Sequence, residues 1–160
     1  MADNPTDEET QRWFRHLGSQ ANNRAWVLAE QAARSPEEDA EMLDAAHASR
    51  YLWSKVGTER NLALANLLLG HVHALLGAGP AAMRYAVDAF GYLTSHESQA
   101  WELAFAHAAL ANAAHAAGRN ELHREHYAKA AEVANTMTSE EDRKIFDASF
   151  IRVPRPAQAG

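Results

Sequence analysis

Short helix-breaking segments recur along this chain at nearly constant spacing, and they constrain its fold more than any other feature. They are Ser35-Pro36, Gly77-Ala78-Gly79-Pro80 and Gly118-Arg119-Asn120. Ser35 and Gly77 lie 42 residues apart, and Gly77 and Gly118 lie 41 residues apart. A fixed period of this length is typical of repeated units in which two helices are joined by a turn. The spacing therefore predicts an all-α fold of stacked antiparallel helical hairpins.

Composition and capping signals favour the same fold. Alanine fills 35 of the 160 positions, and residues with high β-propensity are sparse. Capping boxes, in which a hydroxyl residue is followed three positions later by an acid, occur at Thr6, Ser35 and Thr138. The breaks and caps together predict about eight helices, over residues 7–17, 20–34, 36–56, 59–77, 80–94, 97–117, 120–135 and 139–148.

Length indicates one domain. A chain of 160 residues can bury a single core, so we expect residues 1–152 to form one helical-repeat domain. Residues 153–160 contain two prolines and no apolar periodicity. We expect them to form a disordered C-terminal tail.

Charge and residue usage exclude several classes of protein. The net charge is −6 and no cluster of lysine and arginine is present, which argues against binding to nucleic acid or to an anionic membrane. The absence of cysteine excludes disulfides and thiolate metal sites and fits a reducing compartment. No run of 18 apolar residues occurs, and the N-terminus is acidic where a secretory signal would be basic. The sequence predicts a cytoplasmic protein and indicates no cofactor.

The predicted helices differ in how apolar they are. Apolar residues cover most of the circumference of helices 59–77 and 97–117, which is typical of central helices. The predicted core residues are Leu68, Leu69, Val72, Leu103, Phe105 and Leu110. Helix 36–56 instead has one apolar stripe, made of Met42, Ala46, Ser49, Trp53 and Val56. We expect this helix to lie in an outer layer and Trp13, Phe14 and Leu17 to cover one end of the stack.

Small and apolar residues recur at matching positions across residues 59–135. They are Leu69 and Gly70 with Gly77, Ala82 and Ala89, and then Leu110 with Gly118, Tyr127 and Ala130. This pattern resembles the tetratricopeptide repeat, although that family has a shorter period of about 34 residues. The resemblance implies a tetratricopeptide-like α-solenoid. In such a fold the first helix of each repeat lines a concave groove. Separately, residues 44–58 are similar to a segment of uncharacterised bacterial helical proteins, a likeness that implies no function.

The resemblance predicts which side chains share the groove. A step of 41 residues places Glu30, His71 and Asn112 in one row, with His115 one turn beyond Asn112. The same step places Trp26 and Leu67 in the neighbouring row. A histidine inside an apolar helix is costly to bury without a hydrogen bond, so His71 and His115 are candidate ligand-binding residues. The alternative is that each histidine only bonds a neighbouring side chain.

Two further groups of polar residues are candidates for a chemical role. Asp44, His47 and Tyr51 follow i, i+3, i+7 spacing, so a carboxylate could orient an imidazole, but a charged outer helix face has the same pattern. His123 and His126 share a helix face, and Glu30 could join His71 and His115 as metal ligands. No zinc signature accompanies either set, and the charged surroundings of His123 and His126 favour a solvated face. We therefore predict no metal site.

The sequence contains no catalytic signature. We interpret the chain as a non-enzymatic helical-repeat interaction module that binds a peptide, a protein partner or a second copy of itself, as a homodimer, through the concave groove. The alternative is a small-molecule-binding or metal-binding protein, or a small enzyme, that uses the groove histidines. A wide, shallow apolar surface would favour the first function, and a deep pocket with converging titratable groups would favour the second.

Overall fold

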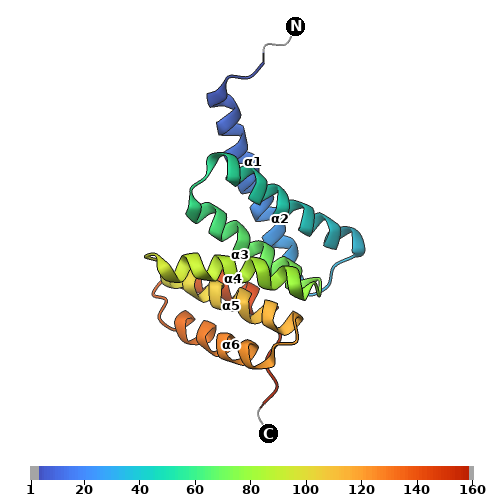
Figure 1. The fold of residues 1–160 in the computed structure, drawn as a ribbon, viewed down its shortest axis with the longest axis vertical. Coiled ribbons are helices and arrows are strands. Elements are labelled where there is room, and N and C mark those ends of the chain that lie inside the picture. The colour runs from blue at the N-terminus through green and yellow to red at the C-terminus, as the bar shows by residue number, and fades with distance from the viewer. Residues whose placement is uncertain (1–3, 159–160) are drawn as a thin grey trace.

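The computed structural model describes residues 4–158, which fold into helices and contain no strand. The helices of this region are α1 (Asp7–Ala29), α2 (Pro36–Val56), α3 (Glu59–Leu75), α4 (Gly79–Ser95), α5 (Ala100–Ala116), α6 (Asn120–Ala134) and α7 (Glu140–Phe150) (Figure 1). The prediction of an all-α fold is thus confirmed. None of these helices is both long enough and apolar enough to span a lipid bilayer.

The described residues form seven helices, where the sequence predicted about eight. The difference lies in α1, which continues through the gap left between the predicted helices 7–17 and 20–34. Gly18 lies inside this helix, and a Cβ atom there would stand 3.2 Å from Nε1 of Trp53. Gly18 therefore gives α2 room to pack against α1, and it does not mark a turn.

Capping and glycine signals explain most of the helix ends. Thr6 and Ser35 form the predicted capping boxes with Glu9 and Glu38. The N-cap of α7 is Ser139, one residue after the predicted Thr138, and its hydroxyl accepts a hydrogen bond from the backbone N–H of Asp142. Gly77 and Gly118 follow the ends of α3 and α5 with φ angles of 73° and 71°, a conformation that favours glycine.

Neighbouring helices in the chain pack as pairs, α1 with α2, α3 with α4 and α5 with α6, and α3 also packs against α5. The central position predicted for α3 and α5 is reflected in burial, since Leu68, Leu69 and Val72 are completely buried. Phe105 and Leu110 are also buried. Leu103 is an exception among the predicted core residues, because it is only half-buried.

The outer face of α2 is as predicted. Met42, Ala46 and Ser49 are buried, while Asp44, His47 and Tyr51 on the opposite face are exposed. Because one face of α2 is buried and the opposite face is exposed, α2 lies in an outer layer of the fold.

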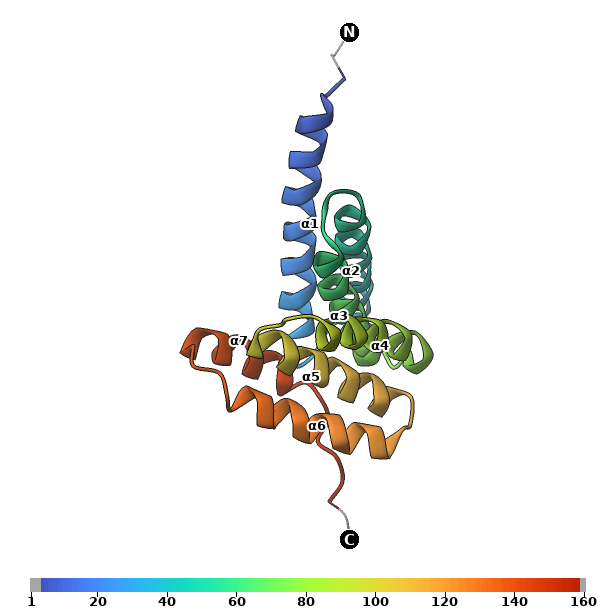
Figure 2. The same cartoon turned by 60° about the vertical axis from the view of Figure 1, so that its left-hand side comes forward.

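The first turns of α1 project beyond the other helices (Figure 2). Trp13 and Leu17 in this segment are 56% and 43% exposed. The prediction that Trp13, Phe14 and Leu17 cover one end of a stack is therefore wrong. Trp53, near the end of α2, meets α1 at Gly18, so α2 ends before it can cover the preceding turns.

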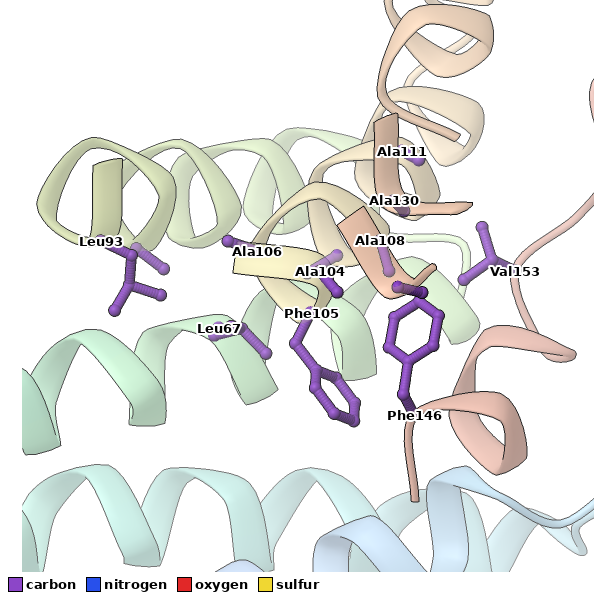
Figure 3. Packing of buried hydrophobic residues seen from close by; sticks show 13 residues of the cluster. Leu67, Leu93, Ala104, Phe105, Ala106, Ala108, Ala111, Ala130, Phe146 and Val153 are labelled. Carbon is purple, nitrogen blue, oxygen red and sulfur yellow. The ribbon is translucent and has the colours of Figure 1, made fainter. Parts of the chain in front are cut away.

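The chain after α7 returns to the core. The rings of Phe105 in α5 and Phe146 in α7 lie 5.3 Å apart and nearly perpendicular, close to Val153 (Figure 3). Val153 is 3% exposed, and the carbonyl oxygen of Pro154 accepts a hydrogen bond from Nε2 of His123 at 2.7 Å. These contacts contradict the expected disorder for Val153 and Pro154, and residues 159–160 lie outside the described part of the chain.

Gly70 sets how closely α3 and α4 approach. A Cβ atom at Gly70 would stand 2.9 Å from the backbone nitrogen and from Cβ of Ala86. We expect Gly70→Ala to lower the free energy of unfolding by about 1–3 kcal/mol, because the two helices must move apart. Gly91 in α4 is the matched control, since no heavy atom lies within 4 Å of a Cβ placed there. Gly91→Ala should raise stability by about 0.5–1 kcal/mol in urea denaturation, and a similar response at both glycines would contradict the prediction.

Candidate functional site

Four helices, α1, α3, α5 and α7, surround a half-open cavity of about 510 Å³. Its main apolar walls are formed by Trp26, Leu64, Leu67, Trp101 and Phe105, with Val27 and Ile145 at exposed positions. Its polar groups belong to Asn22, Asn23, Glu30, Asp142 and Ser149. We call this space the groove cavity. It is within the size range of pockets that bind small ligands or single side chains.

Three aromatic rings form one wall of the groove cavity. Trp101 and Phe105 lie on the same face of α5 at i, i+4 spacing, with ring centroids 6.4 Å apart and planes at 80°. Trp26 reaches the same wall from α1, and its ring lies 5.4 Å from that of Phe105 at 67°. The indole N–H of Trp101 donates to the side-chain oxygen of Gln99 at 2.8 Å, which fixes the orientation of that ring.

His71 lies behind this wall and is almost completely buried. Its ring stacks on Trp26 at 5.5 Å, and the amide nitrogen of Asn112 donates to its Nδ1 atom at 3.1 Å. Because Nδ1 accepts this bond, the proton of the neutral ring is on Nε2, which has no partner among the described residues. Burial, with a smaller contribution from the charge of Arg34, lowers the pKa of His71 to about 4. His71 is therefore neutral at pH 7 and supports Trp26 from behind.

The structure brings most of the predicted groove residues together. Trp26, Glu30 and Leu67 line the groove cavity, and His71 and Asn112 form the layer behind it. The step of 41 residues holds between α3 and α5, where His71 and Asn112 are hydrogen-bonded. Between α1 and α3 the register differs, since Trp26 and not Glu30 stacks on His71. Glu30, one turn further along the chain, lies at the C-terminal end of α1 and accepts a weak hydrogen bond from Ser149 at 3.4 Å.

His115 does not belong to the groove. It is exposed at the end of α5, and its ring lies 4.9 Å from that of His123 in α6. Three residues of helix turn a side chain about 60° away from the row that contains Asn112. This rotation directs His115 towards α6, so its prediction as a groove residue is wrong.

The second candidate group does not assemble either. The ring of His47 lies 5.6 Å from that of His73 and 6.1 Å from that of Tyr85, and no hydrogen bond joins it to Asp44 in the described region. Tyr51 is 58% exposed and lies 5.1 Å from the ammonium group of Lys55. Partial burial, followed by the charge of Arg50, lowers the pKa of His47. The arrangement supports the outer-face interpretation of these residues.

The expectation of a solvated face at His123 and His126 is wrong, because both side chains are buried against the rest of the fold. Nδ1 of His126 lies 2.8 Å from Nδ1 of His107 in α5, and both rings lie nearly perpendicular to Phe90, at 5.0 and 5.1 Å between ring centroids. The signal that could have shown this is the stripe His123, Tyr127, Ala130 and Ala134 along α6. Across residues 4–158 no three or more potential ligand side chains are grouped to hold a metal ion.

Sequence reasoning missed the residues that α7 contributes to the groove cavity, namely Asp142, Ile145 and Ser149. The helix itself was predicted, and its buried residue Phe146 lies one position after Ile145. The missing information was where α7 packs, because a single amphipathic helix does not specify its partner.

Comparisons of the chain with protein families, with curated proteins and with solved structures find no match.

Proposed function

We propose that this protein is a non-enzymatic interaction module of the tetratricopeptide-like kind, which binds a peptide segment of a partner protein in the groove cavity. The observation that carries the proposal is the half-open cavity of about 510 Å³ with an aromatic wall. Trp26 and Trp101 in this wall are partly exposed, and Val27 and Ile145 at its edge are exposed. Apolar surface of this kind is characteristic of sites that receive an apolar anchor from a partner.

The helix pairs and their glycines support the repeat arrangement in this proposal. A Cβ atom at Gly70 in α3 would stand 2.9 Å from Ala86 in α4, so these two helices pack closely, as the two helices of a repeat do. Gly77 and Gly118 occupy equivalent turns after α3 and α5. The hydrogen bond between His71 and Asn112 joins residues that are one step of 41 apart.

The side chains that line the groove cavity favour peptide binding. The alternative function was a small-molecule site, a metal site or an active site that uses the groove histidines. His71 is 3% exposed and is covered by Trp26, so its ring is not presented to a ligand. His115 faces α6 instead of the groove. The titratable side chains that line the cavity are the carboxylates of Glu30 and Asp142.

A substitution at the exposed edge of the groove cavity tests the proposal. A displayed library of random peptides is selected on the immobilised protein, and the affinities of the selected peptides are measured by calorimetry. Val27 lines the cavity and is 54% exposed, so Val27→Arg should block the cavity without unfolding the chain. We expect it to weaken peptide binding by about tenfold or more, which corresponds to about 1.4 kcal/mol.

Val87 in α4 provides the matched control. It is 51% exposed and does not line the groove cavity. Val87→Arg should leave the affinities within about twofold. Equal affinities for wild type and Val27→Arg, or a library that yields no binder, would refute the proposed function.

A further inference from the structure

The groove cavity carries negative charge without a positive partner. Glu30 and Asp142 line it from α1 and α7, and neither belongs to an ion pair within residues 4–158. Among the residues that the structure describes, no lysine, arginine or histidine lines the cavity. Glu41 and the buried Glu102, by contrast, are paired with Arg24 and Arg60.

The aromatic wall adds to this preference for positive charge. The faces of indole and phenyl rings carry negative electrostatic potential and attract ammonium and guanidinium groups. Trp26 and Trp101 are each steeply inclined to Phe105, at 67° and 80°, so the rings of this wall differ in orientation. Leu64 is partly exposed and adds apolar surface against which an aliphatic chain can pack, and Leu67, which is 2% exposed, lies at the base of the cavity.

We infer that the groove cavity recognises a basic side chain of a peptide, whose aliphatic stem packs on the aromatic and leucine walls and whose cationic group is neutralised by Glu30 and Asp142. This inference rests on the proposed function and specifies the chemistry of its ligand. Lysine and arginine both have an apolar stem and a charged head, so one buried side chain can satisfy the apolar and the acidic parts of the cavity together.

Polar groups along α1 extend the same site. Asn22 and Asn23 line the groove cavity and also a neighbouring depression that includes Trp53 and Asn61. A side-chain amide offers one acceptor and two donors, which can bond both the N–H and the C=O of an extended peptide. In the bound peptide, the residues next to the basic side chain can therefore form hydrogen bonds with Asn22 and Asn23, on the side of the cavity nearest Trp53.

The inference is tested with two peptide pools on the wild-type chain of residues 1–160. Both pools are acetylated, amidated hexapeptides with random residues at five positions, and the third residue is lysine in one pool and norleucine in the other. Norleucine retains the aliphatic stem and lacks the charge. We expect the lysine pool to be retained about tenfold more strongly, and we expect this preference to weaken as salt is added.

Variants test whether the carboxylates of Glu30 and Asp142 cause the preference for the lysine pool. The double variant Glu30→Gln/Asp142→Asn should reduce the preference for lysine to within about twofold. Glu121→Gln/Glu125→Gln removes the same charge from exposed positions on α6, outside the groove cavity, and should retain the preference. Thermal melts of each variant establish that it is folded.

The outcomes separate this inference from the proposed function. Equal retention of the two pools, with binding that is still sensitive to Val27→Arg, would overturn the cationic ligand and leave the peptide-binding module standing. Retention that is insensitive to Val27→Arg would overturn both. Hexylammonium serves as a free-cation probe: saturable binding of hexylammonium with no retention of either peptide pool would overturn the assignment to a peptide.

Discussion

Leu69→Ala is expected to lower the free energy of unfolding by about 2–5 kcal/mol. The side chain of Leu69 is completely buried in a cluster where α1, α2 and α3 meet. Several of its neighbours in this cluster, such as Ala25, Ala29 and Ala46, are alanines that cannot extend into the space that is vacated. The substitution therefore leaves a cavity in addition to removing apolar contact area. Urea denaturation should show a lower midpoint with an unchanged slope.

Leu103→Ala is the informative comparison for Leu69→Ala. Both leucines were predicted as core from the sequence, but Leu103 is only half-buried on the face of α5 that also carries His107. We expect its replacement to cost less than half as much as Leu69→Ala, and Asp44→Ala on the outer face of α2 to change stability by less than about 0.5 kcal/mol. An equal loss at Leu69 and Leu103 would contradict the burial that separates them.

Local features of the sequence were sufficient to predict the helices that follow α1. Glycines with positive φ, hydroxyl caps and apolar stripes act locally, so Gly77, Gly118, Thr6 and Ser35 identify helix ends without knowledge of the fold. The continuity of α1 was not predictable in this way. Gly18 is compatible with a turn in the sequence, and only its contact with Trp53 in another helix shows why it lies inside α1.

The candidate site was predicted in part for a related reason. A fixed step along the chain relates helices that pack in the same register, which is how His71 and Asn112 could be paired across 41 residues. The register between α1 and α3 is set by the stacking of Trp26 on His71, and no period in the sequence specifies it. The position of α7 depends on contacts such as that between Phe105 and Phe146, which are distant in sequence. The acidic character of the groove cavity was missed because Asp142 comes from α7.

Stability is expected to fall by about 3 kcal/mol between pH 7 and pH 4 through His71 alone. In the folded protein, burial lowers the pKa of this imidazole to about 4, whereas in the unfolded chain it has its ordinary value of 6.5. Between these two values the unfolded chain binds a proton that the folded protein does not. The contribution of neutral His71 to stability is therefore complete above pH 6.5 and is lost as the pH falls towards 4.

Comparison with His71→Gln isolates this contribution. Carboxylates such as Glu41, whose pKa is lowered by its hydrogen bond from Arg24, also reduce stability in acid, but they do so in both proteins. The difference in unfolding free energy between wild type and His71→Gln should therefore shrink by about 3 kcal/mol from pH 7 to pH 4. His16 is exposed on α1, and His16→Gln is the control for the loss of a histidine at the surface. Parallel curves for wild type and His71→Gln would mean that His71 binds its proton equally well in the folded and unfolded chain, which is incompatible with a buried ring between Trp26 and Asn112.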